Sequence, residues 1–129
     1  MRVWYLDTSA ALKLVLEEPE SEALALHIDS EQPDLAAGWL LESELRRVAN
    51  RVPGLTMDAI SEFLLGVSLY EMPGSVFREA GLLPGPNLRS LDALHLSVAV
   101  RIGVECVVTY DERMAQSASQ LGLPVVAPS

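Results

Sequence analysis

The sequence predicts an α/β fold, a three-layer α/β/α sandwich around a short parallel sheet, and two observations support it. Near each end of the chain, an apolar segment rich in strand-forming residues stops at an aspartate: "RVWYLD" over 2–7 and "VECVVTYD" over 104–111. Elsewhere, segments with helical spacing of apolar residues alternate with short strand candidates. This alternation predicts right-handed crossovers, and therefore a parallel sheet with helices on both faces.

The first half of the chain alternates a strand, two helices, a weaker strand and two more helices. Apolar residues recur at helical spacing in each helix, and acids gather in the early turns of the helix over 20–29. Pro19 stands at a helix-start position, and Thr56 is suited to cap the last of these helices. After the strand over 2–7, the predicted ranges are a helix over 8–18, a helix over 20–29, a strand over 34–38, a helix over 39–51 and a helix over 56–68.

The second half begins with a short strand candidate and a Gly- and Pro-rich region that contains one or two helical turns. A helix follows that is apolar almost all round, which predicts packing on more than one side, and Gly103 ends it. The predicted ranges are a strand over 69–73, the helical turns and loop over 74–90, a helix over 90–103, a strand over 104–111, a helix over 112–122 and a strand over 123–127.

Composition predicts one well-cored domain over residues 1–129, because 50% of the residues are hydrophobic and the chain is too short for two domains. No apolar run approaches a membrane span and no basic leader precedes one, so we expect a soluble cytoplasmic protein. The single cysteine, Cys106, excludes an internal disulfide and is expected to be buried. A net charge of -9 argues against a protein that coats nucleic acid and favours a basic protein partner.

Two aspartates, Asp7 and Asp111, end the two strongest strand candidates. Each could simply cap the helix that follows it. In a parallel sheet, however, the carboxyl ends of the strands meet at one edge, where ligands bind. Two such coincidences therefore favour a shared site over two unrelated caps.

Two further acids stand in unusual helical positions. Glu44 flanks the apolar stripe of its helix and is predicted to face partly inward, either for function or to pair with Arg47. Asp92 lies in the first turn of the nearly all-apolar helix, where the helix dipole alone could account for it, but little of that helix can be solvated. His95, one turn later, is interpreted as a core residue.

If the fold gathers these four carboxylates, their repulsion requires a compensating cation. Hard divalent ions suit oxygen ligands: Mg²⁺ or Mn²⁺ takes one or two carboxylates, keeps several waters and leaves room for a phosphate. Such ions activate water and stabilise the leaving oxygen of a phosphodiester. The cluster would then need no side-chain nucleophile.

Four segments resemble the PIN domain, in particular the VapC toxins of bacterial and archaeal toxin–antitoxin pairs: "WYLDTSAALKLVLEEPES", "SELRRVANR", "LRSLDALHLSVAV" and "VVTYDERM". The resemblance spans essentially the whole chain and implies a metal-dependent endoribonuclease that uses Mg²⁺ or Mn²⁺. It implies that the acidic site consists of Asp7, Glu44, Asp92 and Asp111. Among these, Asp7 and Asp92 would be the direct metal ligands. It also implies that hydroxyl groups beside them orient the carboxylates, those of Thr8, Ser9 and Thr109.

The resemblance further implies a small antitoxin that blocks the acidic pocket with a basic side chain, and a homodimer. The RNA substrate must be held by few cations, since the chain has only nine basic residues. Arg47 and Arg51 lie on roughly the same helix side as Glu44 and are candidates for phosphate contacts, although intrahelical pairing would equally explain them. Lys13, Arg89 and Arg113 lie near the motif segments and are further candidates.

Other classes of protein also place acids at the ends of parallel strands. A receiver-type signalling domain needs a lysine at a late strand end, but the only lysine is Lys13, in the first predicted helix. A haloacid-dehalogenase-like phosphatase needs a second aspartate two residues after Asp7, where the chain has Ser9. A non-catalytic PIN-like binding or scaffold domain, and a housekeeping RNA-processing nuclease without an antitoxin, remain as alternatives.

Overall fold

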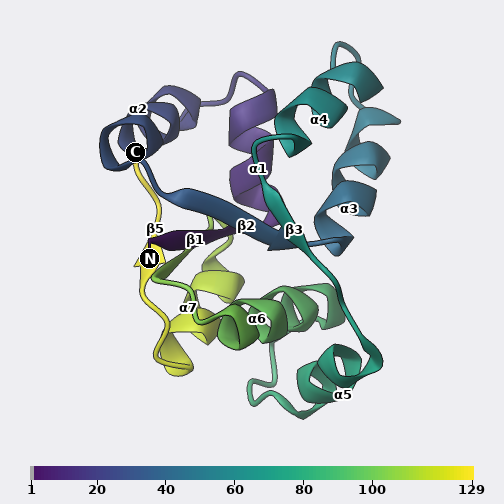
Figure 1. Ribbon diagram of the computed structural model, residues 1–129, viewed down its shortest axis with the longest axis vertical. Helices are drawn as coiled ribbons and strands as arrows, with labels where there is room; N and C mark the ends of the chain where they lie inside the picture. The colour runs from purple at the N-terminus through teal and green to yellow at the C-terminus, as the bar shows by residue number, and fades with distance from the viewer. Residues whose placement is uncertain (1) are drawn as a thin grey trace.

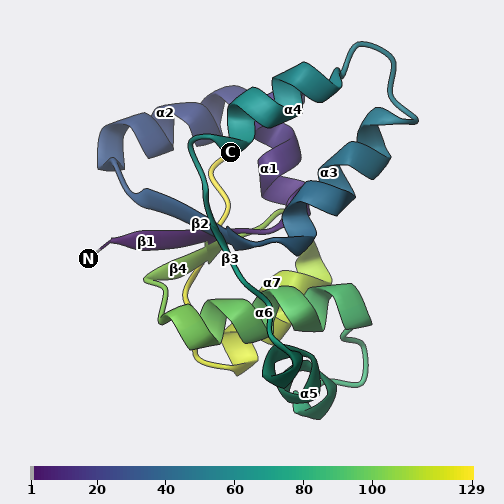
Figure 2. The same ribbon diagram turned by 45° about the vertical axis from the view of Figure 1, so that its right-hand side comes forward.

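The computed structural model describes residues 2–129, which form a parallel five-stranded sheet between two helical layers (Figure 1). The strands are ordered β3-β2-β1-β4-β5, and every neighbouring pair is parallel. Helices α1 to α4 cover one face of the sheet, and α5 to α7 cover the other, as the turned view makes clear (Figure 2). The predicted three-layer α/β/α sandwich is therefore confirmed.

The strands are β1 (Val3–Leu6), β2 (Asp34–Gly38), β3 (Ser68–Tyr70), β4 (Cys106–Val108) and β5 (Val125–Val126). The helices are α1 (Thr8–Val15), α2 (Ser21–Glu31), α3 (Leu40–Ala49), α4 (Met57–Leu64), α5 (Gly74–Leu82), α6 (Ser90–Ile102) and α7 (Glu112–Gln120). In the part of the chain that the structure describes, every helix is too short or too polar to cross a membrane.

Several predicted elements are shorter in the structure, each for a local reason. Helix α1 ends at Val15 instead of residue 18, because Leu16 is extended and Pro19 disfavours helical backbone at the residue before it. Helix α4 begins after Thr56, whose side chain accepts from the Ala59 N–H as predicted, but it ends at Leu64. Ser68 joins β3 instead of extending that helix.

The core lies on both sides of β1, the central strand of the sheet. All four residues of β1 are buried, as are the three residues of β4. Helix α6 buries six of the seven residues over 93–99, all but Leu94, and Gly103 ends the helix in the left-handed conformation at φ 76°. Strands β1 and β4 are therefore packed between the two helical layers, and their carboxyl ends lie side by side at one edge of the sheet.

Cys106 lies within β4 and is only 4% exposed. Burial raises the pKa of its thiol to about 12, with the charge of Glu105 adding to the effect. Because the thiolate is the reactive form, we expect Cys106 to resist alkylation by iodoacetamide at pH 8 in the folded protein and to react once urea unfolds it. Mass spectrometry of labelled protein checks this, and rapid labelling under native conditions would contradict the buried position of β4.

Candidate functional site

Asp7 lies directly after β1, at the carboxyl edge of the sheet, and is only 4% exposed. Its Oδ1 accepts from the Ala10 N–H at 2.9 Å, which caps α1, and from the Ser9 hydroxyl at 2.7 Å. The cap expected from sequence is thus real. It uses only one of the two carboxylate oxygens, however, so capping alone does not account for the whole group.

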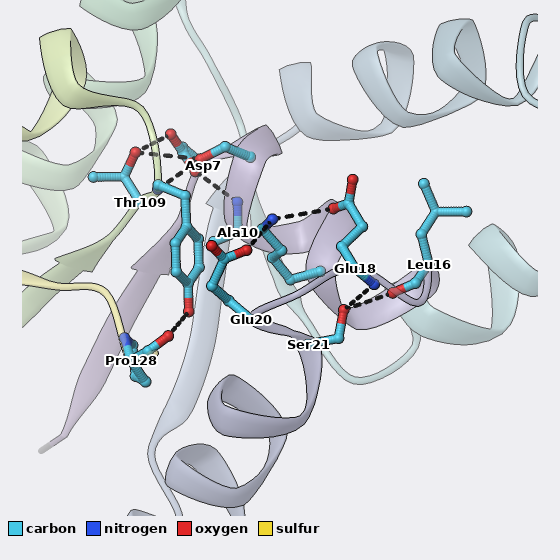
Figure 3. A network of polar contacts seen from close by, with 11 residues as sticks. Asp7, Ala10, Leu16, Glu18, Glu20, Ser21, Thr109 and Pro128 are labelled. Carbon is cyan, nitrogen blue, oxygen red and sulfur yellow. Dashed lines mark hydrogen bonds and ion pairs between the residues drawn. The ribbon is translucent and has the colours of Figure 1, made fainter.

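The second oxygen of Asp7 is held from the neighbouring strand. Thr109, which follows β4, donates its hydroxyl to Asp7 Oδ2, as Figure 3 shows. The same hydroxyl accepts from the Asp111 N–H at 3.1 Å, and Asp111 in turn caps α7 through the Met114 N–H at 3.0 Å. The ends of β1 and β4 are therefore joined by hydroxyl groups between two aspartates.

Burial raises the pKa of the Asp7 carboxyl, while hydrogen bonds from Thr109, Ser9 and the Ala10 N–H partly oppose the rise. The carboxylate is thus kept in a poorly solvated place by donors arranged around it. This is a costly position for a charge that served only as a helix cap.

Asp92 approaches the same place from the first turn of α6. Its pKa is raised by burial, then by the negative charges of Asp111 and Asp7, while the positive charge of Arg89 opposes the rise. No group in residues 2–129 hydrogen-bonds to its side chain, so the carboxylate does not serve as a structural partner there. Three aspartates from different parts of the chain therefore share one electrostatic environment.

Glu44, in α3, is linked to this group through Thr8 and His95. Its Oε1 accepts from the Thr8 hydroxyl at 2.6 Å and from His95 Nε2 at 2.5 Å. Burial alone would raise the pKa of Glu44, but the hydrogen bonds from His95 and Thr8 outweigh it and lower the pKa. The alternative pairing with Arg47 does not occur among the described residues.

The interpretation of His95 as a core residue is confirmed, and the structure adds polar contacts that the sequence did not reveal. The ring is 2% exposed, yet it bridges Glu44 to the Tyr5 hydroxyl, which lies 2.7 Å from Nδ1. The only signal in the sequence was its position one turn after Asp92 on the same helix face.

The donor set of this site fits a hard divalent cation. Mutual repulsion of Asp7, Asp92 and Asp111 would be relieved by positive charge, and carboxylate oxygens are the ligands that Mg²⁺ and Mn²⁺ prefer. Within residues 2–129, no three His, Cys, Asp or Glu side chains are already arranged to hold an ion by themselves. The arrangement thus suits an ion that takes one or two carboxylates and completes its shell with water.

The basic residues near the site differ in their availability. Arg47 and Arg51 are exposed and form no ion pair within the described residues, so intrahelical pairing does not account for them. Arg51 lies just beyond the end of α3, which stops at Ala49 instead of residue 51. The ammonium of Lys13 forms ion pairs with Glu20 and, at 3.5 Å, with Glu18, so it is a weaker candidate for phosphate contact.

Comparison with known proteins bears directly on this edge of the sheet. Residues 4–119 match the model of the PIN domain. The chain is 37% identical to Ribonuclease VapC46 of Mycobacterium tuberculosis over the full length of both chains. This chain belongs to the PIN-domain family, among the VapC ribonucleases.

Solved structures of PIN-domain proteins share the fold. VapC20 of Mycobacterium tuberculosis, a sarcin-ricin loop cleaving toxin, has a TM-score of 0.75 at 16% identity, covering 97% of this chain and 99% of its own. VapBC2 from Rickettsia felis, solved bound to a DNA fragment from its promoter, also has a TM-score of 0.75, at 13% identity and 98% and 99% coverage. The fold is therefore that of PIN-domain proteins over nearly the whole chain.

Proposed function

We propose that this chain is a metal-dependent endoribonuclease whose acidic site consists of Asp7, Glu44, Asp92 and Asp111. The observation that supports it most is the joint position of Asp7, Asp92 and Asp111, whose charges interact at the carboxyl edge of the sheet. Family membership supplies the reaction class, because the relatives are ribonucleases. Clustered carboxylates agree with phosphodiester hydrolysis, because a metal ion held by them would activate a water as the nucleophile and no side-chain nucleophile would be needed.

Each acid has a distinct part in this proposal. Asp7 and Asp92 would hold Mg²⁺ or Mn²⁺ directly, and Glu44 and Asp111 would act through waters of its shell or through a second ion. When bound, such an ion supplies an activated water and stabilises charge on the phosphate. Thr109 orients the Asp7 carboxylate by donating to Oδ2.

Other hydroxyl groups complete this support. Ser9 donates to the other Asp7 oxygen, and Thr8 donates to Glu44. These bonds fix the direction of each acceptor oxygen before substrate arrives, which limits the reorganisation that the reaction would otherwise require.

The biological role that we propose is that of the toxin in a VapBC-type pair in the cytoplasm. A basic side chain of a small antitoxin would enter the acidic pocket, and the chain's charge of -9 is complementary to such a partner. The VapBC assembly known from Rickettsia felis supports a partner of this kind. We also propose a homodimer, which is supported by exposed apolar side chains on α5 and α6, those of Phe77, Leu82 and Val100.

Cleavage of a mixed pool of structured RNAs by the purified protein tests the proposed activity. We expect cuts at few sites with Mg²⁺ or Mn²⁺ and none with EDTA. RNA that stays intact with either metal, at protein concentrations well above those used for related nucleases, would favour a non-catalytic PIN-like binding domain. Metal-dependent cleavage without any genomic or physical antitoxin partner would instead favour a housekeeping nuclease.

Arg47 and Arg51 are proposed to contact phosphates beside the cut. Replacing both with alanine is expected to raise KM severalfold with little change in kcat, and to reduce the slope of log affinity against log salt by roughly one to two. Arg78→Ala is the matched control, because this arginine is also exposed but lies on α5, in the opposite helical layer. Equal effects of the control and of the double variant would contradict a local RNA contact.

A further inference from the structure

A buried chain of hydrogen bonds runs from the backbone of β2 to the carboxylate of Glu44. The Gly38 N–H donates to the Tyr5 hydroxyl at 3.1 Å, this hydroxyl lies 2.7 Å from His95 Nδ1, and His95 Nε2 lies 2.5 Å from Glu44 Oε1. Tyr5 is fully buried and His95 is 2% exposed. Neither the Tyr5 hydroxyl nor the His95 ring caps a helix or completes the sheet.

Counting donors assigns the tautomer of His95. Because the Tyr5 oxygen already accepts from Gly38, its own hydroxyl hydrogen has one acceptor in reach, the Nδ1 of His95. A phenol hydroxyl is protonated at neutral pH, so Tyr5 keeps this hydrogen. Nδ1 is then unprotonated, and the ring hydrogen resides on Nε2, where it points at Glu44. A charged imidazole would leave the Tyr5 hydrogen without a partner in the core.

The consequence for Glu44 is a fixed orientation. Oε1 is held by two donors, the His95 Nε2–H and the Thr8 hydroxyl, from α6 and α1 respectively. Among residues 2–129, no group donates to Oε2. One oxygen of this carboxylate is therefore anchored by the protein, and the other is the oxygen left to act at the site.

We propose that His95 is a positioning residue for the nuclease reaction, locked by Tyr5 in the Nε2–H tautomer so that it aims the free oxygen of Glu44 at the acidic site. This inference rests on the proposed function. It assigns no contact between His95 and RNA, because the ring is buried behind Glu44.

Two amide substitutions test the contacts of the two ring nitrogens separately. The Gln side chain in His95→Gln can place its N–H where Nε2 donates to Glu44, whereas the shorter Asn side chain in His95→Asn can accept from Tyr5 in place of Nδ1 but does not reach Glu44. We expect His95→Asn to lower kcat by about 10- to 100-fold at unchanged KM, the usual cost of losing a hydrogen-bond partner that orients a side chain of a metal site. His95→Gln is expected to recover most of that loss.

A purely structural role for the ring makes a different prediction. Both amides remove the same aromatic packing, so both would lower the thermal midpoint and kcat together, with no rescue by Gln. Equal kcat values for the two variants would overturn the positioning role. Wild type that cuts no RNA would instead refute the proposed function, and a second measurement then still decides the inference.

That measurement is ¹⁵N NMR of the histidine rings in the wild-type protein and in Tyr5→Phe. The chain has two histidines, and His27→Gln assigns the spectrum. We expect the wild-type His95 to show a protonated Nε2 and an unprotonated Nδ1, and Tyr5→Phe to yield a mixture of tautomers. A protonated Nδ1 in the wild type would overturn the inference whatever the activity.

Discussion

Asp7→Asn is expected to lower RNA cleavage by about 10³-fold, equivalent to about 4 kcal/mol of transition-state stabilisation, while leaving the fold intact. Asparagine caps a helix as well as aspartate does and has nearly the same shape, so the bond to the Ala10 N–H is kept. The negative charge is lost, and the amide NH₂ that takes the place of Oδ2 cannot accept from Thr109, so that one hydrogen bond has to reverse its direction. Single-turnover cleavage at saturating Mg²⁺ measures the effect.

The same variant has a stability signature with a defined sign. Burial raises the pKa of Asp7 in the folded state, so its contribution is favourable below the pKa of an unfolded aspartate and is lost as the pH rises through the folded value. Asparagine does not ionise, so its contribution to stability does not change with pH. The free energy of unfolding of Asp7→Asn relative to wild type should therefore increase from pH 3 to pH 7 when metal is absent. An inactive variant that is also strongly destabilised at pH 7 would contradict a mainly functional role for this charge.

Thr109→Val is expected to be the most harmful isosteric change near the site. It removes the donor to Asp7 Oδ2 and the acceptor of the Asp111 N–H, and hydrogen bonds to charged groups contribute about 1.5 to 3 kcal/mol. We expect the free energy of unfolding, measured in urea at pH 7, to fall by that amount, and RNA cleavage to be reduced.

Thr109→Ser is the matched control for this prediction. Serine keeps the hydroxyl and loses one methyl group, so most of both losses should be recovered. If the Val variant were as stable and as active as the wild type, the hydroxyl bridge between the two strand ends would have no role. If the Val and Ser variants were equally impaired, the methyl packing would be the cause.

The fold could be predicted from the sequence because it depends on local patterns, whereas the grouping of the four acids into one catalytic site stays a prediction. Continuous apolarity before Asp7 and Asp111 indicates buried parallel strands, and the carboxyl ends of such strands must lie at one edge. Element ends were less predictable: β4 stops at Val108, because strand pairing, which depends on distant residues, decides where a strand ends.

His95 could not be assigned from sequence for a physical reason. An apolar helix that carries one histidine is equally consistent with a core position and with a bridge to a site. What distinguishes them is a hydroxyl 90 residues away, that of Tyr5, and a carboxylate on another helix, that of Glu44. Both contacts exist only once the sheet and its two helical layers have formed.

The central claim is that the acids at the sheet edge form one cation site, and thermal unfolding with and without Mn²⁺ tests it most directly. The wild-type midpoint should rise with Mn²⁺ concentration, because a ligand that binds only the folded state stabilises it. The rise should disappear in Asp92→Asn and persist in Glu112→Gln, which removes an exposed acid next to Asp111. Identical midpoint shifts in all three proteins would mean that Mn²⁺ binds elsewhere, and would contradict the site.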